Sequence, residues 1–181
     1  MNSSSDDIIR HISKEVFTMA KKRKNEKMYM VLGGFLLGIV VITAFMFMAA
    51  PSLMMIESQS RYDFDETVER FRDQVDDAGW GILNHHDMQE VKAGMGYEVL
   101  PVKVFDVCSG HYSYTILRED DERIVTPMMP CRISIYEKSD GNTYIGRMNS
   151  GLVARLFGGI INDVMQNATA ETEEFLEPLI A

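Results

Sequence analysis

The chain has few of the residues that cross-link a protein or carry out chemistry: its 181 residues include two cysteines, four histidines and one tryptophan. No Cys-x-x-Cys or Cys-x-x-Cys-His sequence occurs, which excludes the common dithiol redox and haem-attachment motifs. A phosphate-binding glycine loop and a nucleophile elbow are also missing. The sequence therefore favours a protein that is not an enzyme.

Positive charge is scarce beyond the first 27 residues. The chain has 18 Lys and Arg and 27 Asp and Glu. Residues 1–27 contain seven of the basic and four of the acidic residues. Residues 28–50 hold none, so residues 51–181 hold the remaining 11 basic and 23 acidic side chains. Nucleic-acid binding needs a basic surface that neutralises phosphates, so this acidic part argues against a nucleic-acid partner.

A long uncharged run is present at residues 28–50, between Lys27 and Pro51. As a helix that rises about 1.5 Å per residue, it is long enough to cross a hydrocarbon core of roughly 30 Å. Lys and Arg next to a first span are retained in the cytoplasm, which predicts that residues 1–27 stay inside. A cleaved secretory signal is the alternative, and the length of the run and Pro51 at its end argue against it.

We therefore expect a single-pass protein of the cytoplasmic (inner) membrane with three parts. Residues 1–27 form a cytoplasmic, basic, amphipathic segment, in which Ile8, Ile12 and Val16 recur at helical spacing. This segment would lie on the membrane surface or dock a partner. Residues 28–50 form the transmembrane helix, and residues 51–181 form an extracytoplasmic domain that is periplasmic or extracellular.

Residues 51–181 mix strand and helix patterns, which predicts one α+β domain: a small antiparallel or mixed sheet covered by helices and preceded by the transmembrane helix. Alternating apolar residues predict strands at 52–60, 81–84, 99–107, 131–137 and 143–148, with a hairpin turn at 140–142. Helical periodicity predicts helices at 63–78, 88–95, 152–165 and 170–179. The sequence His85-His86-Asp87 is expected in a loop.

Gly158 and Gly159 interrupt the last apolar helical pattern. A glycine inside a helix costs about 1 kcal/mol relative to alanine. Close packing against another backbone, in the core or along a dimer seam, is therefore expected to compensate for them.

The outer part of the chain resembles a known family. The helix start Phe-Asp-Glu-Thr-Val at 64–68, the strand end at Cys108 and above all Met-Pro-Cys-Arg-Ile-Ser-Ile-Tyr-Glu at 129–137 are similar to the domain-of-unknown-function family 302, over residues 52–178. The resemblance implies a small α+β domain that often forms a homodimer, with two cysteines and no established reaction. Some members of this family accompany sulfur-oxidation genes. The family commonly has a Cys-Asn-Pro-like turn where this chain has Cys-Ser-Gly-His at 108–111.

Cys108 and Cys131 lie at the end of one predicted strand and at the start of the next, so we expect them to be neighbours. Three interpretations stay open. The thiols can fill core space, or they can form a structural or redox disulfide, which an oxidising compartment permits. They can also bind a metal, a haem or a sulfur species. Arg132 is the one obvious positive charge that could lower a thiol pKa here.

Three histidines of the outer part could assist such chemistry, because imidazole and thiolate are ligands that zinc and copper prefer. His111 follows Cys108 by three residues, and His85 and His86 are adjacent. Neighbouring side chains on a strand point to opposite faces, so His85 and His86 rarely share one metal. Solvated loop positions are the alternative for all three.

The methionines raise copper as a further candidate, since a thioether is a soft ligand that suits this metal. The chain has 14 of them, and several lie in or beside the uncharged run, where methionine is apolar filler. Met128 and Met129, close to Cys131, are the pair placed to act with a thiol. No metal or cofactor is predicted outright.

Two hypotheses of different classes follow. In the first, the chain is a membrane-anchored, extracytoplasmic binding or assembly module that forms a homo-oligomer or joins a larger membrane complex. In the second, it is a thiol-redox, sulfur-handling or metal- or haem-binding protein that uses Cys108 and Cys131, assisted by His111 or His86.

Overall fold

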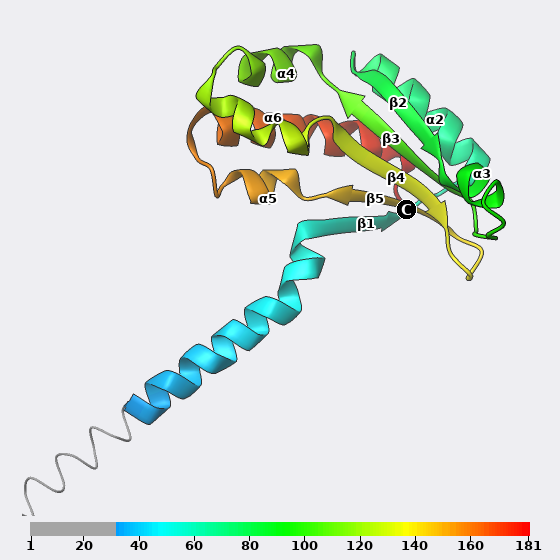
Figure 1. Cartoon of the computed structure of the whole chain (residues 1–181). Coiled ribbons are helices and arrows are strands. Elements are labelled where there is room, and N and C mark those ends of the chain that lie inside the picture. The colour runs from blue at the N-terminus through cyan, green and yellow to red at the C-terminus, as the bar shows by residue number, and fades with distance from the viewer. Residues whose placement is uncertain (1–31) are drawn as a thin grey trace, which may run out of the picture. The chain divides into compact units, whose positions relative to one another are not determined.

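The computed structural model describes residues 32–181 and contains an apolar helix, Leu32–Met54, followed by an α+β domain (Figure 1). The chain divides into two compact units, Met1–Ala50 and Pro51–Ala181. The strands are β1 Met55–Gln59, β2 Gly81–Asp87, β3 Val102–Cys108, β4 Cys131–Glu137 and β5 Thr143–Met148. The α-helices are α2 Phe64–Asp77, α3 Met88–Ala93, α4 Gly110–Leu117, α5 Ser150–Ala154 and α6 Gly159–Leu176. Two 3₁₀ helices are present, η1 Asp121–Met128 and η2 Glu177–Leu179.

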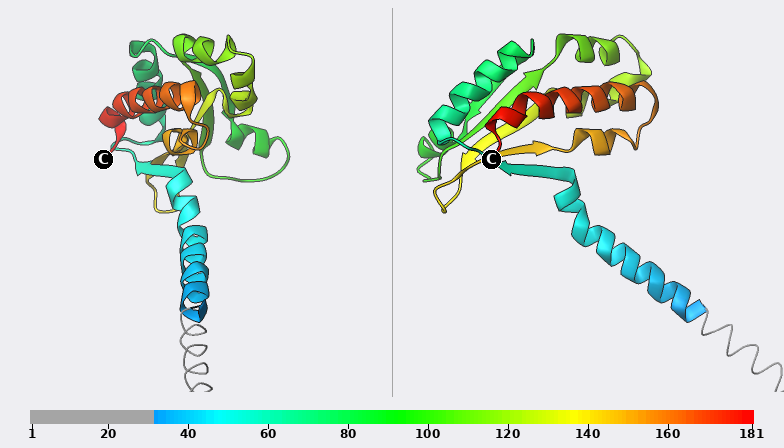
Figure 2. Two further views of the ribbon diagram at one scale, coloured as in Figure 1. Left: turned by 90° about the vertical axis from the view of Figure 1, so that its left-hand side faces the viewer. Right: turned by 180° about the vertical axis from the view of Figure 1, so that it is seen from behind.

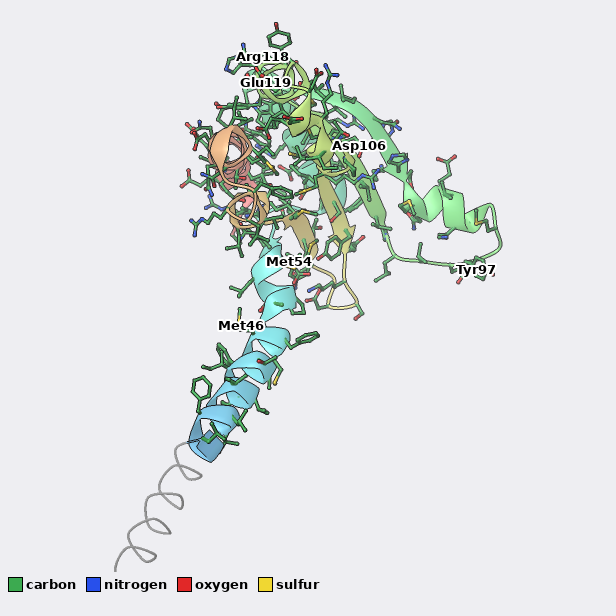
Figure 3. All side chains as sticks on the ribbon, turned by 60° about the vertical axis from the view of Figure 1, so that its left-hand side comes forward. Met46, Met54, Tyr97, Asp106, Arg118 and Glu119 are labelled. Atoms are coloured by element: carbon green, nitrogen blue, oxygen red, sulfur yellow. The ribbon has the colours of Figure 1, made fainter. Side chains whose placement is uncertain are left out.

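The most apolar stretch of the helix Leu32–Met54 has a mean hydropathy of 2.4. By length and composition the helix is able to cross a membrane, a property that it shares with signal sequences. Its side chains project outward, and none of its most apolar stretch is buried (Figure 3). The helix continues past Pro51, where the sequence predicted its end, so the strand expected from residue 52 begins only at Met55. Proline removes one backbone hydrogen bond, and the last turn forms without it. The predictions for residues 1–27 and for the start of the run at 28–31 lie outside the described residues.

The strands found within residues 32–181 form one antiparallel sheet in the order β1-β5-β4-β3-β2. The predicted hairpin joins β4 to β5, and Gly141 supplies its turn with a positive φ of 78°. The first strand, β1, pairs with the last one, β5, so that Met55 lies opposite Met148. The α+β prediction is confirmed, and the sheet is antiparallel rather than mixed.

Helices α2 and α6 lie on one face of the sheet and form the main core with it (Figures 1 and 2). Helix α2 begins where the sequence predicts, because the Asp63 carboxylate accepts a hydrogen bond from the Glu66 amide (2.9 Å) and caps the helix. Its buried stripe packs on the sheet, with the rings of Phe71 and Phe105 5.0 Å apart. The core comprises Val68, Phe71, Val75, Trp80, Phe105, Val107, Ile133, Ile135, Ile145, Ala168, Phe175, Leu176 and Leu179.

A smaller core joins α4, η1, α5 and the first half of α6, through Ile116, Val125, Ala154, Ile161, Val164 and Met165. The sequence did not predict α4 or η1. Helix α4 buries only one residue of its own, Ile116, so its apolar periodicity is weak. Packing against α6, distant in sequence, is what stabilises it.

The predicted loop at His85, His86 and Asp87 is wrong, because these residues belong to β2 and pair with residues 103–105 of β3. Pairing with a long neighbouring strand satisfies their backbone groups, which outweighs their polar composition. A bulge between Ile82 and Asn84 interrupts the register of the two strands. Strand β3 likewise begins at residue 102 instead of 99.

The sequence predicted close packing against another backbone at Gly158 and Gly159, and this prediction is wrong. A Cβ atom at either position would meet no atom within 4 Å. Both have positive φ values, 68° and 53°, and form the break between α5 and α6. Their role is therefore conformational, and α6 then continues without interruption to Leu176.

Candidate functional site: a sulfur-lined pocket

The two cysteines meet where β3 ends and β4 begins. Cys131 lies opposite Val107, and Cys108 is the next residue along β3. From a strand separation of about 5 Å and a rise of about 3.4 Å per residue, the Cα atoms of Cys108 and Cys131 are about 6 Å apart. Both are partly exposed, free thiols in this structure. The expectation that they are neighbours therefore agrees with the strand register, and the disulfide stays a prediction.

A pocket opens beside the cysteines, between the ends of β3 and β4 and helices α4 and α6. It leaves about 40 Å³ for the centres of water-sized molecules, room for an ion or a few atoms. Its lining includes five sulfur-bearing side chains, from Cys108, Met128, Met129, Cys131 and Met165. We call this cavity the sulfur pocket. It is far too small for a haem, which needs a cavity of several hundred Å³.

The Cys131 thiol is held in its neutral form. Burial, and then the nearby Cys108, raise the pKa of Cys131 above its usual value. Arg132, the expected source of positive charge, instead donates from Nε to Asp106 Oδ1 (2.9 Å), and its side chain is 70% exposed. The site therefore lacks the electropositive surroundings of a reactive, low-pKa cysteine.

The aromatic wall of the sulfur pocket is fixed by one carboxylate of α6. Glu171 accepts a hydrogen bond from Trp80 Nε1 (3.0 Å) at one oxygen and from the Tyr112 hydroxyl (2.6 Å) at the other. The hydrogen bond to Glu171 and burial raise the pKa of Tyr112, so its hydroxyl stays a donor. The rings of Trp80 and Tyr112 lie 6.2 Å apart. Glu171 on α6 therefore joins α4 and the residue that precedes β2 around the pocket.

The histidines predicted to assist the cysteines lie elsewhere. His85 stacks on the ring of Phe105 (6.2 Å between ring centroids). His86 points to the other face, where its Nε2 lies 3.4 Å from Asp106 Oδ2 (Figure 3 labels Asp106). His111 lies on α4, with its ring against Tyr112 and outside the pocket lining.

Within residues 32–181, no three His, Cys, Asp or Glu side chains gather in a way that could hold a metal ion. The divergence of His85 and His86 agrees with the expectation for adjacent residues of a strand. The ligands that the sulfur pocket offers are consequently sulfur atoms and not imidazoles.

A second cavity, also of about 40 Å³, lies on the other side of Cys131 and Met128. Arg147 and Glu173 line it and are paired by two hydrogen bonds, of which Nε to Oε1 measures 2.7 Å. Arg147 Nη1 also donates to Ser58 Oγ (3.2 Å). Through these contacts Arg147 ties β5 to β1 and to α6.

Sequence reasoning identified Cys108, Cys131 and the Met128-Met129 pair but missed the other half of the pocket. Met165 and Glu171 come from α6, more than 30 residues after Cys131, and no local pattern connects them. The separate helix predicted at 170–179 also placed Glu171 outside the main helix.

Comparison with known proteins adds the family context. The profile of the family described as "Domain of unknown function DUF302" matches residues 56–181. The crystal structure of an uncharacterized conserved DUF302 protein from Bacillus stearothermophilus is similar to this chain, with a TM-score of 0.63 and 18% sequence identity. The match covers 70% of this chain and 98% of that one, so the two share a fold. No curated protein matches the chain.

Proposed function

The chain belongs to the DUF302 family, and we propose that this member is a single-pass, membrane-anchored binding module that works outside the cytoplasm. Its ligand site is the sulfur pocket. The observation that carries the proposal is an unburied apolar helix in the same chain as a domain with a small, preformed cavity.

The helix Leu32–Met54 supports the anchor. Its residues are apolar on every side, and Phe47 and Met48 are each 82% exposed. A surface of this kind is stable in hydrocarbon and unfavourable in water, at roughly 25 cal/mol for each Å². The excess of basic over acidic residues in residues 1–27 supports an orientation with the domain outside the cytoplasm.

The orientation is tested with the full chain in right-side-out membrane vesicles. An epitope placed after Ala181 should be removed by external protease, whereas an epitope placed before Met1 should be protected. Replacing the basic cluster Lys21, Lys22, Arg23 and Lys24 by serine should weaken this preference. Protection of the epitope after Ala181 in sealed vesicles would show that the domain is cytoplasmic.

A binding function also requires that small molecules reach the sulfur pocket. A small methanethiosulfonate reagent should modify Cys131 in the folded chain and change the emission of Trp80, because both residues line the pocket. A bulky maleimide should react much more slowly. If the small reagent modifies Cys131 only after unfolding, even at a pH that ionises this thiol, the pocket is closed and the binding function is refuted.

We further propose that the module is a homo-oligomer, with α3 and the following loop as the contact. Met95, Tyr97 and Leu100 expose 62%, 64% and 51% of their surfaces, and Tyr97 lies on a loop that projects from the domain (Figure 3). Exposed apolar surface of this kind is typical of a protein contact. A second copy of the chain fits it, because apolar side chains are complementary to a copy of themselves.

The oligomer is tested by light scattering of the full chain in detergent. Tyr97→Asp should yield monomers, whereas Leu156→Asp should not, because Leu156 is 85% exposed in the connection between α5 and α6, away from α3 (Figure 1). A monomeric parent protein would refute the homo-oligomer.

A second candidate function is thiol redox, favoured by the two free thiols that line one cavity. Titration of the full chain with and without reductant should then find two thiols that disappear together on oxidation. Closing the loop of 22 residues between the cysteines would stabilise the domain by roughly 3 kcal/mol in the chain-entropy model. Cys131→Ser should remove the response of the melting temperature to reductant.

A further inference from the structure

Most of the side-chain atoms in the sulfur pocket that could bind a metal ion are sulfur atoms. Two thiols and three thioethers line one cavity, and its lining includes no histidine, aspartate or glutamate. The carboxylate of Glu171, which contacts two residues of this lining, has both oxygens engaged by Trp80 and Tyr112. Thiolates and thioethers together select monovalent copper, whereas magnesium and calcium require oxygen ligands.

We propose that the sulfur pocket binds one Cu(I) ion through Cys108 and Cys131, with thioether ligation from the methionines that line it. The inference rests on the proposed binding function and names its ligand. It does not depend on the anchor or on the oligomer.

The lining of the pocket supports a shared ion. Cys108 and Cys131 both line the same cavity, one at the end of β3 and the other at the start of β4. Met128 and Met129 precede β4, and Met165 faces the cavity from α6, so thioethers are available from two further elements.

The size of the pocket also fits this ion. About 40 Å³ accommodates a single bare ion in contact with side chains, and Trp80, Val164 and Ala168 form an apolar wall beside it. A sulfur-rich site disfavours Cu(II), which prefers nitrogen and oxygen ligands. The site should therefore be selective for the reduced ion.

The binding step is balanced without any redox partner. Two copper–sulfur bonds form, two thiol S–H bonds break, and two protons leave to solvent while copper stays monovalent. The affinity should rise with pH, because the thiols lose their protons when they bind copper.

The experiment is an anaerobic titration of the fully reduced full chain in detergent with Cu(I) in competition with a chromophoric chelator. We expect one Cu(I) for each chain, ultraviolet thiolate-to-copper absorption and quenching of Trp80, the only tryptophan of the chain. Zn²⁺ should bind far more weakly, because the pocket does not provide the four nitrogen, oxygen or thiolate ligands that this ion prefers.

Matched variants locate the site. Cys108→Ser and Cys131→Ser should each lower the affinity about 100-fold or more, since even residues that only support a ligand are worth about 10–100-fold. Met128→Leu and Met129→Leu together should cost about 10-fold, whereas Met55→Leu, at an exposed position outside the pocket lining, should have no effect. Trp80 emission without metal shows whether each variant has folded.

The inference is overturned if the reduced chain binds no Cu(I), if the cysteine variants bind it as tightly as the parent, or if Zn²⁺ binds equally well. If one of these results is found while the small reagent still reacts normally with Cys131, the copper proposal is refuted and the binding-module proposal is not. A closed pocket, by contrast, removes the proposed function itself.

Discussion

Removal of the Glu173 carboxylate is expected to destabilise the domain far more than removal of the carboxylate next to it. The Arg147 side chain is 5% exposed, and Glu173 is its only carboxylate partner within the described residues. Glu173→Ala therefore leaves a buried guanidinium whose remaining side-chain hydrogen bond, among residues 32–181, is the one to Ser58. Glu174→Ala is the matched control, because Glu174 is exposed on the same helix.

The size of the effect follows from the exposure of the two partners. Breaking a buried ion pair on one side costs about 3–5 kcal/mol. The Glu173 side chain is 39% exposed, so water can replace part of what Arg147 loses. We therefore expect Glu173→Ala to cost about 2 kcal/mol, which for a domain of about 130 residues lowers the melting temperature by roughly 6–10 °C.

The assay is unfolding of the full chain followed by the fluorescence of Trp80, which is 6% exposed and packs against Phe175 of α6. Glu174→Ala should stay within about 0.5 kcal/mol of the parent. Replacing both partners, with Arg147→Met and Glu173→Ala, should recover part of the loss, since no charge is then left buried. Equal effects of the two glutamate variants, or no recovery in the double variant, would refute this reasoning.

Three further predictions concern other parts of the domain. Gly146→Val should lower the free energy of unfolding by about 1–3 kcal/mol in urea titrations, because a Cβ atom there would lie 2.8 Å from Ser134 Oγ. Asp63→Ala should cost about 1 kcal/mol in the same titration, through loss of the cap on the Glu66 amide. Burial raises the pKa of Cys131, so its contribution to stability should be complete below pH of about 8.5 and decline as pH rises further, when the unfolded chain ionises first. Thermal unfolding of the parent at several pH values should show this decline, and Cys131→Ser should lack it.

The parts of the fold that were predictable are those with a local signal. Strands β4 and β5 alternate clearly, and the turn at Gly141 has the residue that its positive φ requires, so both strand bounds were right. Strand membership of His85 and His86 depends on pairing with β3, about 20 residues later, and their polar character concealed it. Nonlocal pairing of this kind leaves no trace in a short window of sequence.

The same distinction applies to the sulfur pocket. The proximity of Cys108 and Cys131 was predictable, because one ends a strand and the other begins the next. The inclusion of Met165 and the clamp at Glu171 were not, because they depend on how α6 packs across the ends of β3 and β4. A sulfur atom far along the chain becomes a potential ligand only through tertiary structure.

The pairing of β1 with β5 sets a delay in the biogenesis of this protein. Met55 and its partner Met148 are 93 residues apart, and at about 5–20 residues per second a ribosome takes roughly 5–19 s to synthesise that interval. The bridge between Ser60 and Ile180 forms later still, after residue 180 has been made. Strand β1 therefore has no pairing partner until β5 has been made, and we expect chaperones to protect this nascent segment during that interval.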